Sequence, residues 1–106
     1  MLSIFNFYGD QVASGANYLD VVAPEWVSKI DLGSLGMAWP KSCVLGQVFG
    51  SYETGLRRLG LDEAYAQGNG FNIGSNGQYI QFVAYPFLKA AWMREIKSRQ
   101  LGQVPT

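Results

Sequence analysis

The feature that most constrains this chain is an apolar stripe between residues 43 and 59. Its members recur at spacings of three, one, three, four and three, which is the period of an amphipathic helix; they are Leu45, Val48, Phe49, Tyr52, Leu56 and Leu59. Ser42 is placed to cap the start of this helix, and Gly60 is placed to stop it. The pattern predicts one helix from about Cys43 to Leu59.

A second stripe lies near the end of the chain, where Leu88, Trp92 and Ile96 follow one another at i, i+4 and i+8. Pro86 precedes it, and proline is favoured at the first position of a helix. We therefore expect a closing helix from Pro86 to Leu101. This helix and the helix at 43–59 should form the heart of the core.

Three weaker segments complete the helical pattern. Residues 11–22 carry apolar side chains at helical spacing, with Asp10 as the expected N-cap. Residues 24–30 begin with a proline and predict a short helix that turns Trp26, Val27 and Ile30 inward. Residues 62–68 predict one or two helical turns closed by a glycine. The intervening loop over 31–40 should tuck its apolar side chains, Trp39 among them, against the core.

Glycines raise two open alternatives. Gly46 and Gly50 lie one turn apart inside the predicted helix, where glycine costs about 0.5–1 kcal/mol each. They serve either close packing within the domain or a groove for a partner's aromatic side chain. Residues 68–77 contain four glycines, so residues 71–73 and 78–82 either pair as a β-hairpin or form a loop that leads into the last helix.

The fold class predicted from these elements is mainly α, with α+β as the alternative if a short hairpin forms over residues 71–83. A chain of 106 residues suits a single domain. Within this domain, residues 1–9 are expected to be an apolar N-terminal arm or strand, and residues 103–106 a frayed tail.

Charge and composition exclude several function classes. Eight basic and eight acidic residues give a formal net charge of zero, which disfavours general binding to nucleic acid or to an anionic membrane. The chain has no histidine and one cysteine, so we expect no metal and no cofactor. The lone cysteine favours a reducing compartment, and neither a membrane span nor a signal peptide is evident. We expect a cytoplasmic protein.

Three candidate sites follow from the residues. The first is the apolar arm, whose exposure would create a patch for self-association or for a protein partner; its residues are Leu2, Ile4, Phe5, Phe7 and Tyr8. The second is a basic set on the last helix that would contact nucleic acid, namely Lys89, Arg94, Lys97 and Arg99. The third is the thiol of Cys43, placed at a predicted helix start where the dipole lowers a thiol pKa.

A set of short motifs supports a family resemblance. The chain contains Pro24-Glu25-Trp26, Cys43-Val44-Leu45-Gly46-Gln47 with Gly50 one turn later, Leu59-Gly60-Leu61, Gly70-Phe71, and a closing helix with Trp92. In this pattern it resembles a family of small uncharacterised proteins from actinobacteria and their bacteriophages. The resemblance implies a phage or actinobacterial source and no activity. We interpret Trp26, Cys43, Gly46, Gln47, Gly50, Gly60, Phe71 and Trp92 as structural.

The leading hypothesis is therefore a non-enzymatic interaction protein, phage-encoded, that binds a host or phage protein and forms a homodimer in one version of the hypothesis. A DNA-associated regulator and a thiol-dependent enzyme are the alternatives. A solvent-open cavity in which Cys43 lies among converging polar groups would contradict the leading hypothesis.

Overall fold

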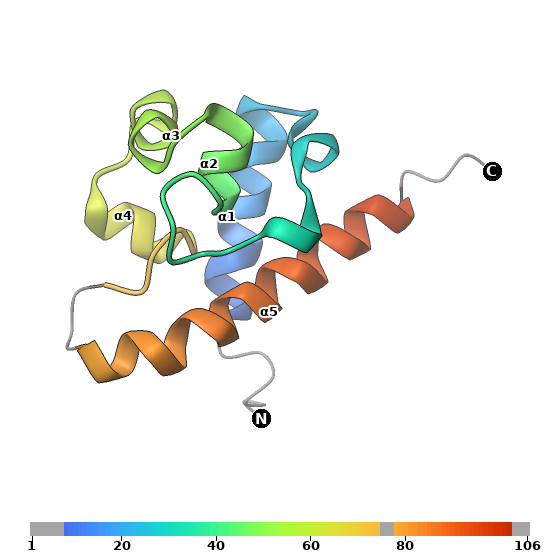
Figure 1. Ribbon diagram of the computed structural model, residues 1–106. Coiled ribbons are helices and arrows are strands. Elements are labelled where there is room, and N and C mark those ends of the chain that lie inside the picture. Colours follow the sequence, from blue (N-terminus) through green and yellow to red (C-terminus); the bar gives the residue numbers. More distant parts are fainter. Residues whose placement is uncertain (1–7, 75–77, 103–106) are drawn as a thin grey trace.

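The computed structural model describes residues 8–74 and 78–102, and for residues 78–83 it describes the backbone alone. Over this part of the chain the fold is mainly α, as predicted, and contains no strand. The elements are α1 (Gly9–Val22), η2 (Trp26–Lys29), η3 (Leu32–Ser34), α2 (Val44–Phe49), α3 (Tyr52–Leu59), α4 (Glu63–Gly68) and α5 (Gln78–Gly102), where η marks a 3-10 helix. Helix α5 packs on α1 and η2, while α2 packs on α3 (Figure 1).

The predicted helix over 43–59 is two helices rather than one. Gly50 has φ +98°, a conformation that ends α2, and Ser51 then caps α3 by accepting a hydrogen bond from the Thr54 backbone N–H at 3.1 Å. The first cap is also corrected, because Cys43 rather than Ser42 precedes α2. Gly60 ends α3 in the left-handed conformation (φ +69°), as predicted.

The apolar stripe survives this break because the two short helices fold onto each other. A Cβ atom built on Gly55 of α3 would lie 2.7 Å from Cβ of Leu45 in α2, so only glycine allows this approach. Leu45, Val48, Leu56 and Leu59 are all buried, and Phe49 and Tyr52 pack against the same core.

Helix α5 begins at Gln78, so the start predicted at Pro86 is wrong. Of the two alternatives for residues 71–83, the structure favours the loop that leads into the last helix, and it contains no hairpin within the described residues. The expected turn at 75–77 lies outside them. Pro86 is inside the helix, where proline removes a hydrogen bond and costs about 3 kcal/mol. The buried face nevertheless continues on both sides of it, from Ala84 to Leu88 and Trp92. Packing of this continuous face outweighs the local cost.

Smaller elements follow the predicted pattern with shifted boundaries. Residues 24–30 form a 3-10 turn instead of a short α-helix, but Trp26, Val27 and Ile30 are buried as expected. Helix α1 begins at Gly9, so Tyr8 is its N-cap and Asp10 lies in its first turn. The helical turns predicted over 62–68 are helix α4, which runs from Glu63 to Gly68 with Asp62 as its N-cap.

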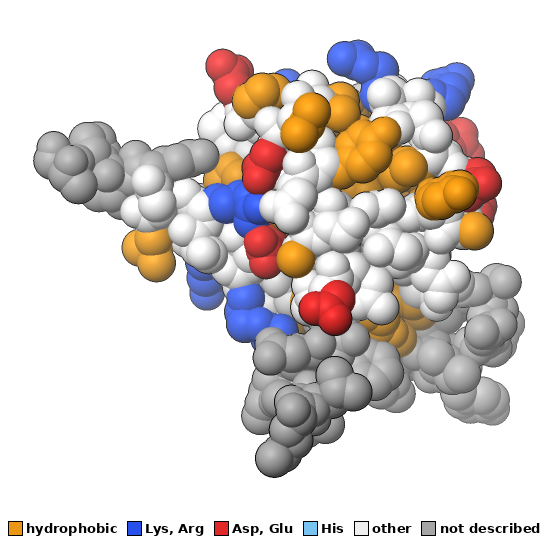
Figure 2. Space-filling model, turned by 180° about the vertical axis from the view of Figure 1, so that it is seen from behind, with side chains coloured by type: hydrophobic (Ala, Val, Ile, Leu, Met, Phe, Trp, Pro, Cys, Tyr) orange, Lys and Arg blue, Asp and Glu red, His pale blue; other side chains and the backbone are white. Residues whose placement is uncertain are grey.

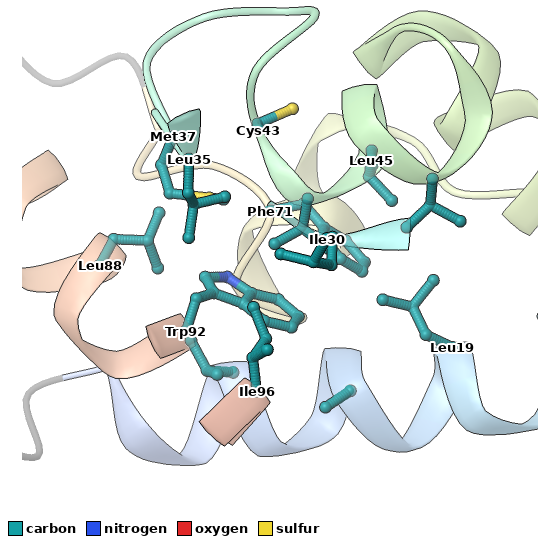
Figure 3. Packing of buried hydrophobic residues seen from close by; sticks show 14 of the residues in the cluster. Leu19, Ile30, Leu35, Met37, Cys43, Leu45, Phe71, Leu88, Trp92 and Ile96 are labelled. Carbon is teal, nitrogen blue, oxygen red and sulfur yellow. The ribbon is translucent and has the colours of Figure 1, made fainter. Parts of the chain in front are cut away.

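The centre of the core is aromatic. The ring of Trp92 stacks on Phe71 at 5.6 Å between centroids and meets the edge of Trp26 at 5.9 Å. Both indole N–H groups have acceptors: Trp92 donates to the Gly70 carbonyl at 2.6 Å and Trp26 to Asp20 Oδ1 at 2.8 Å. Leu88, Trp92 and Ile96 reach from α5 toward this centre (Figure 3). Its heart therefore includes α1, η2 and residues 70–71 as well as the two helical regions that were predicted.

Candidate functional site

The described residues line an open cavity of about 510 Å³ between four parts of the chain. Its wall is formed by the loop over 37–40 with Cys43, by Tyr52 of α3 and by three residues of α4. Phe71, Asn72 and Gly74 complete it, together with Tyr85 of α5. Several of these residues, such as Trp39 and Glu63, are exposed, whereas Phe71 is buried. The cavity therefore has a solvent-facing mouth and an apolar floor. Its size suits a side chain or a small molecule.

Three polar side chains are joined on one wall of this cavity. The Tyr52 hydroxyl donates to Glu63 Oε2 at 2.9 Å, and Asn72 Nδ2 donates to the same oxygen at 3.0 Å and to the Tyr52 hydroxyl at 2.8 Å. Asp62 caps α4 through the Tyr65 backbone N–H and so fixes the turn that carries Glu63. Burial first, and then the Glu63 carboxylate, raise the pKa of Tyr52 to about 12. The phenol thus stays protonated and holds the carboxylate in place.

Cys43 lies in the wall of the same cavity but is 2% exposed. Its Sγ accepts a hydrogen bond from the Gly46 backbone N–H at 3.3 Å as the cap of α2. Burial raises the pKa of the Cys43 thiol, whereas the sequence pattern predicted a lowered value. A solvent-open cavity in which Cys43 lies among converging polar groups is the arrangement that would contradict the leading hypothesis. The cavity is present, but the Cys43 thiol is buried and hydrogen-bonded to the backbone of Pro40 and Gly46, whereas Tyr52, Glu63 and Asn72 are hydrogen-bonded to one another. The contradicting arrangement is therefore met only in part.

Trp39 is placed differently from the prediction, which tucked it against the core. Its side chain is 66% exposed and lines the cavity, while the backbone around it is tightly held. The Trp39 N–H donates to the Gly36 carbonyl at 3.1 Å, and the Trp39 carbonyl accepts from the N–H groups of Ser42 and Cys43 at 3.2 and 3.0 Å. A large aromatic ring is thus presented to solvent on a fixed turn.

The predicted interaction arm falls mostly outside the described residues, because Leu2, Ile4, Phe5 and Phe7 all precede residue 8. Tyr8 is described; it is half-buried, packs against the core and occupies the N-cap position of α1 without a side-chain capping bond.

The basic set on α5 is divided by the fold. Arg99 is bound by Asp20 at 2.9 Å and by Glu95, and it also lies over the ring of Trp26. Asp20 and Arg99, which lie near opposite ends of the sequence, therefore form an ion pair within one chain. Arg94 and Lys97 are exposed and Lys89 is half-buried. On the face shown in Figure 2, blue and red side chains are interspersed and form no continuous basic stripe among the described residues.

The remaining motif residues have structural roles. The Gln47 side chain accepts from the Asp31 N–H at 2.6 Å and donates to the carbonyls of Asp31 and Ser42, which ties the 31–42 loop to α2. A Cβ atom on Gly46 would lie 2.4 Å from the Pro40 carbonyl oxygen. Gly46 therefore packs within the domain, whereas a Cβ atom on Gly50 would meet nothing within 4 Å, and the positive φ of Gly50 serves to end α2.

Sequence reasoning missed the group formed by Trp39, Tyr52, Glu63 and Asn72. These residues come from four segments, and no periodicity links them. The described residues contain no group of three potential metal ligands. Among the helices described, none combines the length and the apolar character needed to cross a bilayer.

Comparison of this chain with protein-family models, with curated proteins and with solved structures gives no match.

Proposed function

We propose that this chain is a non-enzymatic interaction protein that binds another protein through the mouth of the cavity. The observation that carries the proposal is Trp39, a large aromatic side chain 66% exposed on a hydrogen-bonded turn beside an open cavity. Tryptophan is among the residues most enriched at the energetic centres of protein interfaces, where a rigid ring meets a desolvated pocket. The backbone around Trp39 needs little ordering on binding because hydrogen bonds already fix its turn.

The resemblance of the sequence supports a source for the protein, and the partner is part of our proposal. We place the protein in a phage of an actinobacterium, acting in the host cytoplasm on a host or phage protein, either as a monomer or as a homodimer. The balanced charge and the occupied Arg99 disfavour the DNA-associated alternative.

The test is affinity capture from host extract with quantitative mass spectrometry, using the wild type, Trp39→Ala and Tyr65→Ala. Tyr65 is a matched control because it is 67% exposed and does not line the cavity. We expect one partner to be captured by the wild type and by Tyr65→Ala, and to be depleted at least tenfold with Trp39→Ala. A protein that stays monomeric in solution and captures nothing would refute the proposal.

A second function, thiol-dependent chemistry at Cys43, is favoured by one observation: the thiol lines a cavity that also carries Tyr52 and Glu63. Its burial and raised pKa oppose it. The discriminating measurement is the alkylation rate of the folded protein by iodoacetamide near neutral pH. A thiol that reacts faster than free cysteine would favour the enzyme, and a slower one the interaction protein.

A further inference from the structure

The charge inside the cavity has one sign. Glu63 is the one charged residue among the described residues that line it, and neither lysine nor arginine is among them. A carboxylate beside a partly enclosed space attracts a cation and repels an anion. A neutral apolar occupant would remove water from this carboxylate without replacing the lost hydrogen bonds.

The carboxylate of Glu63 is held in place through one oxygen, and its other oxygen accepts no hydrogen bond from a described residue. Oε2 accepts from Tyr52 and Asn72, whereas no described residue donates to Oε1. Glu63 is exposed, so the second oxygen is accessible to an incoming donor. Because the two donors to Oε2 hold the group in place, little ordering is required when Oε1 gains a partner.

Four aromatic rings line the same cavity, beside aliphatic and polar side chains. Trp39 stands at the mouth, Tyr52 and Tyr85 are half-buried, and Phe71 closes the floor. The faces of such rings attract cations, and tryptophan does so most strongly. A guanidinium satisfies both features, because its planar face stacks on an aromatic ring while its N–H groups donate to a carboxylate.

We infer that the cavity binds an arginine side chain of the protein partner, whose guanidinium donates to Glu63 Oε1 and stacks on Trp39. This inference rests on the proposed function, since it names the group that the partner inserts. It makes the cavity a specific pocket and not a general apolar surface.

The test uses N-acetyl-arginine amide as the probe and N-acetyl-citrulline amide as its neutral isostere, followed by the indole N–H signals in NMR spectra. Of the three tryptophans, Trp26 and Trp92 have their indole N–H groups hydrogen-bonded in the core, so the Trp39 signal should respond. We expect saturable binding of the arginine probe with millimolar affinity, and binding of the citrulline probe that is at least about tenfold weaker. Equal binding of the two probes, or no saturable shift, would overturn the inference.

Two variants locate the site. Glu63→Gln removes the charge with little change in shape and should weaken the arginine probe about tenfold. Glu53→Gln changes an exposed glutamate that does not line the cavity, and it should leave binding unchanged. The backbone spectra of both variants report whether the fold is intact. An unchanged affinity in a folded Glu63→Gln variant would refute the assignment to this cavity.

The outcomes also separate this inference from the proposed function. Partner capture that depends on Trp39 but is unchanged in Glu63→Gln would overturn the arginine pocket while supporting the interaction protein. Binding of the arginine probe by a protein that captures no partner would support the pocket and refute the interaction role.

Discussion

Gly15 is the position where a single methyl group should reveal how closely α1 is packed. Its Cβ atom would lie 2.0 Å from the Asn69 carbonyl oxygen and 3.2 Å from Cζ of Phe71. The first of these atoms belongs to the backbone, so Gly15→Ala forces either α1 or the turn at 69–70 to move by roughly 1.4 Å to reach an ordinary contact of 3.4 Å. That turn is held by several hydrogen bonds, including the one from Trp92 to the Gly70 carbonyl.

The expected magnitude follows from two opposing terms. Inserting a methyl group into a packed site costs about 1–3 kcal/mol, and the contact at Gly15 lies at the severe end of that range. Replacing a helical glycine with alanine returns about 0.5–1 kcal/mol. The net loss should be about 2 kcal/mol, which lowers Tm by roughly 8–16 °C in a domain of this size.

Urea unfolding followed by circular dichroism measures this loss, and Gly68→Ala is the matched control. Gly68 also lies in a helix, but a Cβ atom there would meet nothing within 4 Å. We expect Gly68→Ala to be neutral or slightly stabilising. If Gly15→Ala is as stable as the wild type, the close approach of α1 to the 69–70 turn is incorrect.

Three further predictions concern stability and titration. Gln47→Ala should lose about 1–2 kcal/mol in urea unfolding, because the loop at 31–42 loses its side-chain hydrogen bonds to α2; a change within about 0.5 kcal/mol would contradict this role. Hydrogen bonds from Arg99 lower the pKa of Asp20, so the folded state binds fewer protons than the unfolded state. The stability advantage of the wild type over Asp20→Asn should therefore be full above about pH 4 and disappear as pH falls through the lowered value. A stability advantage of the wild type that grows as the pH falls would contradict a lowered pKa of Asp20. Burial raises the pKa of Tyr52 to about 12, so between about pH 10 and pH 12 the phenol ionises in the unfolded state before it does in the folded state. The free energy of unfolding of the wild type should therefore fall more steeply with pH than that of Tyr52→Phe. Equal slopes of stability against pH in the two proteins would refute the buried, hydrogen-bonded phenol.

Helical periodicity predicted the parts of this fold in which local and tertiary preferences agree. The stripe of Leu88, Trp92 and Ile96 and the stripe from Leu45 to Leu59 are buried as expected. The break at Gly50 was missed although a local signal exists. Gly50 is a helix stop, and Ser51 directly after it is an N-cap residue that accepts a hydrogen bond from Thr54.

Two other errors concern Pro86, where packing outweighs a local preference, and Trp39, where a loop residue was expected in the core. Pro86 favours a helix start, but a buried face from Ala84 onward carries α5 through it. Trp39 was placed in the core because large apolar side chains usually are, yet the turn from Gly36 to Cys43 directs it to solvent. Periodicity carries no information about a residue in a loop, so its exposure was not predictable.

The cavity was beyond the reach of sequence patterns for a related reason. Glu63 and Asn72 are nine positions apart, and Trp39 and Tyr85 come from separate segments. From the sequence alone, Glu63 is an acid at a helix start, Asn72 is an amide in a loop, and Trp39 and Tyr85 are core rings. Only the packing of α3 and α4 against the 37–43 loop brings them to one site.

The most direct test of an interaction role for this surface is site-specific photo-crosslinking in host cells. A benzophenone amino acid replaces Trp39 in one variant and the exposed Tyr65 in another. The account predicts one discrete crosslinked partner from position 39 and none from position 65. No adduct at position 39, or the same adducts from both positions, would contradict it.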